Sequence, residues 1–310
     1  MNPTIIVQEK PGQALLQQKM VDTSNYPFTL NTNIGCLYGC SYCYLQTHPF
    51  NLHTEFGKEI KVKAWLPERL DLELSMKADL PQHLKRVQVN AATEGYLPQA
   101  LHAFKTETGR DLMREILQVF QNHWDNDNRW MVHIVTKSHL IRRDLDLIAE
   151  MRNQVQIELT ITTLDEEKAR LLEGTAPTVA KRLLLIEDFA ARGIFVRVMC
   201  MPFLGNEEEA RETRQVLMNV GTQGFKHKGM NYWDEAELMK GNVVRKTGKR
   251  DLIFQELLLK SGESYPGDGS QRPIPLQMPI GKTKRFETKI MNHVDFGYRD
   301  INGENWGYVH

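Results

Sequence analysis

Short apolar runs alternate with amphipathic stretches along most of this 310-residue chain. Runs rich in β-branched and other apolar residues predict five strands, at Phe28–Asn33, Val87–Asn90, Met131–Thr136, Gln156–Thr162 and Phe195–Met201. A candidate sixth strand covers Phe225–Tyr232. Because strands that alternate with helices are typical of βα units around a parallel sheet, the pattern predicts an α/β fold with a partial (β/α) barrel.

Apolar residues recur at helical spacing between the predicted strands. Helices are expected over Gly109–Trp124, over a segment capped by Asp144, from Thr178 to Gly193, and over Glu207–Val220. In sheets of this kind the chemistry gathers beyond the carboxyl ends of the strands. Candidate site residues are therefore sought at those ends.

Both ends of the chain depart from this rhythm. The predicted organisation is an N-terminal extension (1–27), a barrel core (28–205) and a C-terminal addition (206–310) that completes and covers the barrel. Short helices are expected at Ala14–Met20 in the extension and at Asp251–Lys260 in the addition. The tail from Ser261 is rich in proline and glycine, which predicts irregular backbone.

The charge balance removes several classes of function. Lys plus Arg and Asp plus Glu each number 39, so no global field attracts nucleic acid or an anionic membrane, although a local basic groove remains compatible. The chain has no apolar run of about 18 residues, so no membrane span is expected. The first residues do not resemble a secretory signal. We expect a cytoplasmic protein with no membrane partner.

Three of the four cysteines lie within eight residues, with the spacing C-x3-C-x2-C: Cys36, Cys40 and Cys43. Such crowding favours a metal in a reducing compartment over disulfides. Iron–sulfur clusters are held by thiolates, and a four-iron cluster normally has four. Three thiolates on one loop would leave the fourth iron open to a reactant. A structural zinc site is the alternative, with His48 or His53 as the fourth ligand.

The cysteine loop, with Tyr42 directly before its last cysteine, resembles that of the radical S-adenosylmethionine (SAM) superfamily. Further blocks, collinear over roughly residues 28–205, resemble the spore photoproduct lyase-like branch: Thr29–Tyr44, Thr93–Pro98, Val135–Ser138, Arg143-Asp144, Ile161–Asp165, Leu172-Glu173, Ala176-Pro177, Val196–Met199 and Pro202. The resemblance implies a partial (β/α)6-type radical SAM barrel and a [4Fe–4S] cluster on Cys36, Cys40 and Cys43. It further implies SAM at the open iron, reductive cleavage of SAM to methionine and a 5′-deoxyadenosyl radical, and an electron donor such as flavodoxin or ferredoxin.

The resemblance also implies roles in binding SAM for residues near the strand ends. Tyr42 is expected against the adenine, Thr93 and Glu94 near the methionine amino group, and Lys137 against the SAM carboxylate. Ordinary alternatives remain open for two of these predictions. Tyr42 is also a candidate for simple aromatic packing, and Thr93 with Glu94 for capping the N-terminus of a helix.

Two later strands supply further candidates for binding SAM. Thr160 and Thr162 share a face of the fourth strand, because side chains alternate along a strand. Arg197 lies on the fifth strand. Threonine is also a good strand former, and Arg197 is equally a candidate for a structural ion pair.

The chain departs from the lyase branch at the hydrogen donor. Spore photoproduct lyases use a cysteine near the end of the second strand, and the stretch Val89–Glu94 contains none. The spare thiol, Cys200, is a candidate for a relocated donor in catalysis. It is alternatively a small core residue, because free cysteine is among the most buried residue types.

The resulting hypothesis is a radical SAM enzyme that abstracts hydrogen from an unidentified substrate, with a small molecule or peptide favoured. Repair or modification of nucleic acid, as in the lyase branch, is the first alternative. Basic and aromatic residues of the tail would serve it by holding and stacking bases, or else form an ordinary solvated surface. A non-catalytic iron–sulfur or zinc protein is the second alternative.

Overall fold

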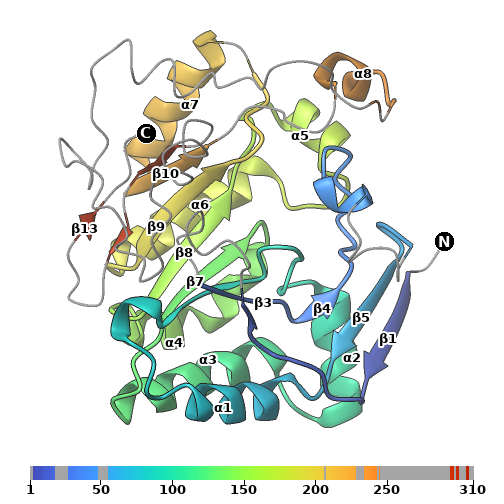
Figure 1. Ribbon diagram of the computed structural model, residues 1–310. Helices are drawn as coiled ribbons and strands as arrows, with labels where there is room; N and C mark the ends of the chain where they lie inside the picture. Colours follow the sequence, from blue (N-terminus) through green and yellow to red (C-terminus); the bar gives the residue numbers. More distant parts are fainter. Residues whose placement is uncertain are drawn as a thin grey trace, which may run out of the picture.

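The computed structural model describes residues 3–17, 27–47, 55–205, 207–227, 234–242, 244, 294–296, 298–299 and 305–306. Its centre is an open eight-stranded sheet with the order β11-β10-β9-β8-β7-β6-β3-β2, flanked by helices (Figure 1). No helix in these ranges is long and apolar enough to cross a membrane.

Six neighbouring strands of this sheet run parallel. They are β3 (Phe28–Leu30), β6 (Arg86–Val89), β7 (Met131–Thr136), β8 (Val155–Thr160), β9 (Phe195–Cys200) and β10 (Gly224–His227). Antiparallel strands flank them, β2 (Leu16–Gln17) beside β3 and β11 (Val294–Phe296) beside β10. The partial (β/α)6-type barrel is therefore confirmed, and the sixth predicted strand is β10, which is described as far as His227.

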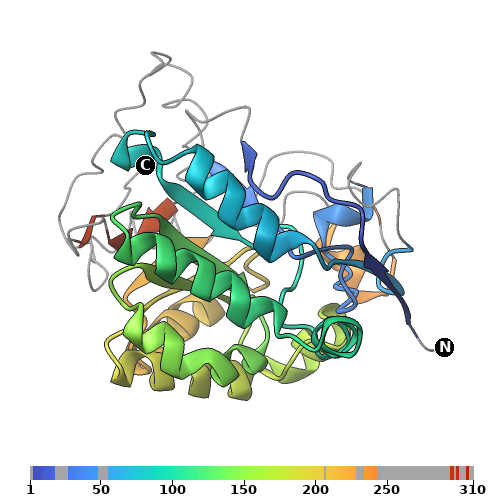
Figure 2. The ribbon, with the colours of Figure 1, turned by 90° about the horizontal axis from the view of Figure 1, so that it is seen from below.

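Alternation along the strands separates an apolar face from a polar one. Gln88, His133 and Gln156 are register partners across β6, β7 and β8, and Glu158 faces Arg197 between β8 and β9. The other face is made of valines, isoleucines and leucines, and helices cover it. Figure 2 shows α1, α3, α4 and α6 in succession along this side of the sheet.

Eight α-helices are described. They are α1 (Leu66–Met76), α2 (Pro98–Thr108), α3 (Leu112–Asp125), α4 (Leu145–Glu150), α5 (Glu166–Leu172), α6 (Val179–Ala191), α7 (Glu207–Asn219) and α8 (Glu235–Met239). Short 3-10 turns lie at Tyr44–Thr47, Gln82–Leu84 and His139–Asp144. The helix expected from Thr178 is α6, and the Thr178 hydroxyl accepts a bond from the Lys181 amide, as predicted. Asp144 precedes α4 without capping it, because its carboxylate pairs with Arg114 instead.

The first residues of the chain are built into two sheets. Strand β1 (Thr4–Gln8) pairs with β5 (Glu59–Lys63), which also pairs with β4 (Asn33–Ile34). The helix predicted at Ala14–Met20 is wrong over its described part, where Leu16–Gln17 form β2. The Glu73 carboxylate accepts bonds from the amides of Ala14 and Leu15, both at 2.9 Å. The residues of this segment are good helix formers, but tertiary contacts such as these override intrinsic helix propensity.

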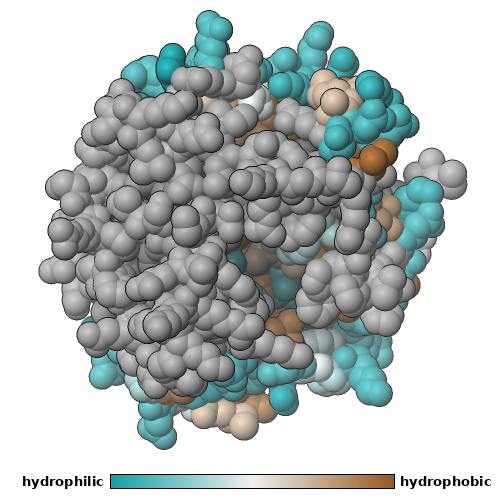
Figure 3. Space-filling model, turned by 45° about the horizontal axis from the view of Figure 1, so that its top comes forward, coloured by the Kyte–Doolittle hydropathy of each residue, from teal (hydrophilic) through white to brown (hydrophobic). Residues whose placement is uncertain are grey.

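The C-terminal addition is described in part. Helix α7 and strand β10 continue the barrel pattern, and β12 (Tyr298–Arg299) pairs with β13 (Asn305–Trp306) within the predicted tail. The helix predicted at Asp251–Lys260 lies outside the described residues, as do the basic tail residues Lys282, Lys284, Arg285 and Lys289. Figure 3 shows one face of the molecule, with a hollow near its centre. Both hydrophobic and hydrophilic residues of the described part of the chain are visible in this hollow.

Candidate active site

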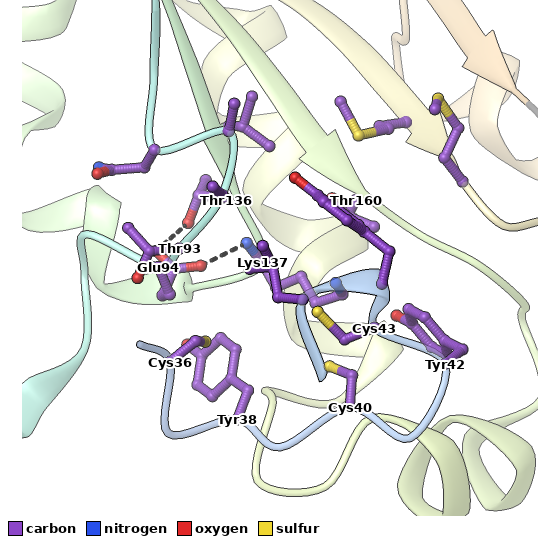
Figure 4. Close-up of a pocket in the computed structure, with 18 of the residues that line it drawn as sticks. Cys36, Tyr38, Cys40, Tyr42, Cys43, Thr93, Glu94, Thr136, Lys137 and Thr160 are labelled. Carbon is purple, nitrogen blue, oxygen red and sulfur yellow. Dashed lines mark hydrogen bonds between the residues drawn. The ribbon is translucent and has the colours of Figure 1, made fainter. Parts of the chain in front are cut away.

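A cavity of about 330 Å³ lies between the cysteine loop and the carboxyl ends of the parallel strands (Figure 4). Its lining includes Cys36, Tyr38, Cys40, Tyr42 and Cys43 from the loop, Asn90, Thr93 and Glu94 after β6, and Gln88, Val135, Thr136, Lys137, Thr160, Met199, Met201 and Pro202 from the strands and the residues that follow them. The structure therefore brings eight of the eleven predicted site residues to one cavity. Its position is the one that parallel β/α sheets reserve for ligands.

The three loop cysteines present their thiols to this cavity. Burial raises the pKa of all three thiols. For Cys40 the pKa rises to about 11, with the nearby Lys137 ammonium opposing the increase. A metal that binds these sulfurs must therefore displace their protons, as is usual for thiolate ligands.

The arrangement of the cysteines fits a multi-iron cluster better than a single zinc ion. Zinc requires its sulfur ligands about 2.3 Å from one common point. Among the described residues, no three His, Cys, Asp or Glu side chains are grouped to hold one metal ion. His48 and His53, the candidate zinc ligands, lie outside those residues. Thiolates that each bind a different iron do not need to converge on one point.

Glu94 is buried at the rim of the cavity and fixes the end of β7. Its carboxylate accepts bonds from the Thr136 hydroxyl at 2.7 Å and the Lys137 amide at 2.9 Å (Figure 4). It also accepts a bond from the Tyr96 amide at 3.0 Å. Burial raises the pKa of Glu94 despite these bonds. A carboxylate has about four lone-pair positions, so a further donor in the cavity finds an acceptor here.

Lys137 places a positive charge beside the cysteine loop. Its Nζ lies 5.4 Å from the centre of the Tyr42 ring, a cation–π distance. Burial alone would lower the pKa of Lys137, but the neighbouring Cys40 and Glu173 raise it above its usual value. Lys137 is the single Lys or Arg among the described residues that line the cavity.

Thr93 braces the segment that leads into the cysteine loop. Its hydroxyl donates to the Gly35 carbonyl at 2.5 Å and accepts from the Asn33 amide nitrogen at 2.6 Å. The capping alternative for Thr93 and Glu94 is wrong for α2, because that helix begins at Pro98 and has no side-chain cap. Thr93 is thus a bracing residue whose hydroxyl is already engaged.

Three predicted site residues do not line the cavity. The Thr162 hydroxyl donates to Glu173 at 2.9 Å, and Arg197 forms a buried ion pair with Glu158, which matches the structural alternative for Arg197. Cys200 is fully buried in the hydrophobic core. Its neighbour Met199 lines the cavity, so alternation directs the Cys200 thiol to the other face of β9. This placement opposes the predicted donor role and fits a small core residue.

Two important residues were absent from the sequence prediction of the site. Glu173 and Arg182 are buried and form an ion pair behind the cysteine loop. The sequence marked Glu173 only as part of a block similar to the lyase branch. Its contact with the Tyr42 hydroxyl joins residues 131 positions apart, which no local pattern shows.

Comparison with known proteins identifies the family. The model of the radical SAM superfamily matches residues 30–217, which is more than half of the chain. The chain belongs to the radical SAM superfamily. The cofactors of this radical SAM protein are accordingly a [4Fe–4S] cluster and SAM, and its chemistry is the cleavage of SAM by a radical route.

Relatives of this radical SAM protein occur in distant organisms. An uncharacterized protein of Acidianus two-tailed virus is 26% identical over 261 residues, which cover 75% of this chain and 79% of the viral protein. An uncharacterized protein of Mycobacterium tuberculosis is 30% identical over 206 residues, covering 64% of this chain and 56% of that protein. The match thus spans little more than half of the mycobacterial relative.

A solved structure shares the fold. A mutant of spore photoproduct lyase, with bound AdoMet and dinucleoside spore photoproduct, superposes with a TM-score of 0.51 at 15% identity. The superposition covers 70% of this chain and 56% of the lyase chain. At this identity the likeness establishes the fold alone.

Proposed function

We propose that this protein cleaves SAM reductively and uses the product to remove a hydrogen atom from a small molecule or peptide. The observation that carries the proposal is the placement of Cys36, Cys40 and Cys43 in one cavity with Lys137 and Glu94. When bound, the reduced cluster and SAM supply a 5′-deoxyadenosyl radical, and the protein's own task is to hold and shield them.

The residues of the cavity divide this task among them. Cys36, Cys40 and Cys43 hold the cluster. Lys137 carries the positive charge that pairs with the SAM carboxylate, and Glu94 offers an acceptor to the methionine amino group while it fixes the Lys137 amide. The thiolates thus face the cluster, the ammonium faces the carboxylate of the methionine moiety, and the Glu94 carboxylate faces its amino group.

Tyr42 and Thr160 complete the proposed SAM site. The Tyr42 ring is buried beside Lys137, where it offers a flat apolar surface to the adenine. Thr160 lines the cavity from the end of β8 and offers a hydroxyl to the polar groups of SAM. Both side chains come from elements fixed at the cavity wall.

The wall beyond the cysteine loop favours an uncharged reacting group. Val135, Met199, Met201 and Pro202 line it, together with Gln88. A phosphate-rich substrate would be expected to meet several cationic side chains there, whereas Lys137 is the single Lys or Arg among the described residues of the lining. The segment after β6 has no cysteine, and Cys200 is buried in the core. The three thiols that line the cavity are assigned to the cluster, so none is left to return hydrogen to a product. Both observations count against repair of the lyase type.

The experiment is anaerobic. The protein is reconstituted with iron and sulfide, reduced with dithionite and given SAM, and 5′-deoxyadenosine is measured by mass spectrometry. Cys40→Ala is expected to abolish the product, and Cys200→Ala, which alters a core thiol, to retain it. Product formation by Cys40→Ala would refute the proposal.

The substrate class needs a separate measurement. Oligonucleotides are titrated into the reconstituted protein at several salt concentrations. Weak, nonspecific binding is the expected result. Tight binding whose affinity falls steeply with salt would identify a nucleic-acid substrate and overturn the assignment to a small molecule or peptide.

A further inference from the structure

The cysteine loop rests on residues 172–175, which are the last residue of α5 and the three residues after it and are called here the loop platform. The Ser41 amide donates to the Leu172 carbonyl at 2.8 Å, and the Thr175 amide donates to the Tyr38 carbonyl at 3.1 Å. The Thr175 hydroxyl donates to the Leu37 carbonyl at 3.2 Å. Backbone groups along the loop are thus paired with the platform.

Gly174 allows the loop and the platform to approach each other. Its φ of +58° lies in the left-handed region that favours glycine. A Cβ at this position would lie 2.0 Å from the Tyr38 carbonyl oxygen, a backbone atom of the loop. Any side chain here must therefore push the two segments apart.

Glu173 ties the platform to the cysteines and to the sheet. Its carboxylate accepts from the Tyr42 hydroxyl at 2.5 Å and pairs with Arg182. Its carbonyl oxygen accepts a weak bond from the Cys40 thiol at 3.7 Å. Arg182 also donates to the Thr160 carbonyl at the end of β8, at 2.9 Å. One connected network therefore reaches from the loop to the strand that borders the cavity.

We propose that the platform holds the cysteine loop in its cluster-binding conformation before the cluster arrives, with Glu173 as a positioning residue that acts through Tyr42 and Arg182. The loop between β4 and the turn at Tyr44–Thr47 has no regular secondary structure, so ordering it on binding would cost conformational entropy. The platform has already fixed it. Glu173 itself is not among the residues that line the cavity, which assigns it to the support of the loop.

This role of the platform requires only that the three cysteines bind the [4Fe–4S] cluster of the superfamily. It does not depend on the proposed hydrogen abstraction. Its readouts are accordingly the iron and sulfide content after reconstitution and the rate at which a chelator removes iron. Hydrogen exchange of the Ser41 and Thr175 amides reports the loop contact directly. A protein that fails to cleave SAM still gives a result in each of these measurements.

The first test is Gly174→Ala with Gly193→Ala as its matched control. Gly193 has a φ of +69° and no atom within 4 Å of an added Cβ, so it carries similar backbone strain without the contact to the loop. We expect Gly174→Ala to lose iron about ten- to a hundredfold faster than the wild type, and Gly193→Ala to stay within about twofold. Equal rates in the two variants would overturn the proposal.

The second test concerns Glu173. A single Glu173→Gln change leaves Arg182 as a buried unpaired charge and risks misfolding. The double variant Glu173→Gln/Arg182→Met removes both charges together, with Glu167→Gln on the exposed side of α5 as the control. Faster iron loss and faster exchange of the Ser41 amide are expected in the double variant only. Wild-type values for both would refute the positioning role.

Tyr42→Phe keeps the proposal testable if the double variant does not fold. It removes the hydroxyl bond to Glu173 and leaves the charges and the ring in place. About tenfold faster iron loss is expected, as for a hydrogen bond to a charged group. An unchanged rate would show that Glu173 does not act through Tyr42.

Discussion

Lys137 and Lys63 are both largely buried, and their surroundings give them opposite properties. Around Lys137, attraction to the Glu173 carboxylate and to Cys40 in its thiolate form outweighs burial and raises the pKa of the lysine, so the ammonium stays charged at the cavity. Lys63 lies at the end of β5, where burial lowers its pKa to about 8. Its Nζ donates to the Asn31 carbonyl at 2.7 Å, a neutral acceptor. The positive charge of Lys137 is thus stabilised at the cavity, whereas the charge of Lys63 lowers the stability of the folded state.

Lys137→Met is expected to weaken SAM binding by about ten- to a hundredfold, the range for losing a hydrogen bond to a charged group. The cluster content should stay near the wild-type value, because the three cysteines are unchanged. Titration of SAM into the cluster-loaded protein, followed by EPR spectroscopy, gives the affinity. Lys181→Met, on the exposed side of α6, is the control. Unchanged affinity in Lys137→Met would remove this lysine from the SAM site.

Lys63 predicts a dependence of stability on pH. Its folded-state pKa of about 8 is below the usual 10.5, so the unfolded chain binds the extra proton between these values and stability rises with pH across them. The free energy of unfolding of the wild type, relative to Lys63→Met, should therefore increase by about 3 kcal/mol from pH 8 to pH 10.5. Urea unfolding of the cluster-free proteins measures it. The exposed Lys105→Met variant should follow the wild type, and a flat difference for Lys63→Met would contradict the prediction.

At the scale of elements, a buried ion pair joins β8 to β9. Arg197 and Glu158 are each 1% exposed, and Glu158 also accepts from the Gln88 amide at 2.9 Å. Arg197→Met should destabilise the fold by about 3–5 kcal/mol, because it leaves a buried carboxylate without its cation. Glu158→Gln/Arg197→Met should recover most of this loss while it keeps an acceptor for Gln88. The midpoints of urea unfolding measure both effects.

The same pair of variants tests the SAM-binding role that the sequence suggested for Arg197. Because Arg197 does not line the cavity, SAM affinity should be near the wild-type value in the double variant. A double variant as unstable as the single one, or one that binds SAM much more weakly, would show that Arg197 has a role outside the pair.

The elements that the sequence predicted correctly are those with a strong local pattern. Strands β7 and β8 are runs of β-branched and apolar residues, and α6 has a threonine cap and a terminal glycine. Strand β2 was missed because two residues carry too little pattern. Its conformation depends on β3 and on Glu73, which lies 58 and 59 positions from the amides that it accepts.

At the scale of the whole molecule, the site also contains residues that local sequence signals predicted and residues that depend on contacts between distant segments. The cysteine spacing and the residues at the strand ends are local signals, and they identified eight of the residues that line the cavity. Glu173 and Arg182 support the loop through contacts between distant segments, and Cys200 was assigned to a site that strand alternation keeps from it. The sequence therefore predicted groups that line the cavity and missed the groups behind the cysteine loop.

Cluster and SAM together should stabilise the whole fold. The proposed SAM contacts come from the cysteine loop, the segment after β6, and the ends of β7 and β8, so SAM bridges segments that unfolding must separate. A ligand at a hundred times its Kd adds about 2.7 kcal/mol to the free energy of unfolding. For a chain of this size we expect a rise in Tm of about 5 °C.

The shift should require the cluster, because in this superfamily SAM binds the open iron. Thermal unfolding is compared with and without SAM in the cluster-loaded wild type and in Cys36→Ala/Cys40→Ala/Cys43→Ala. We expect the rise in the wild type alone. An equal rise in both would mean that SAM binds without the iron. No rise in a protein with a verified cluster would favour a non-catalytic iron–sulfur protein, since a SAM-cleaving enzyme must bind SAM in its folded state.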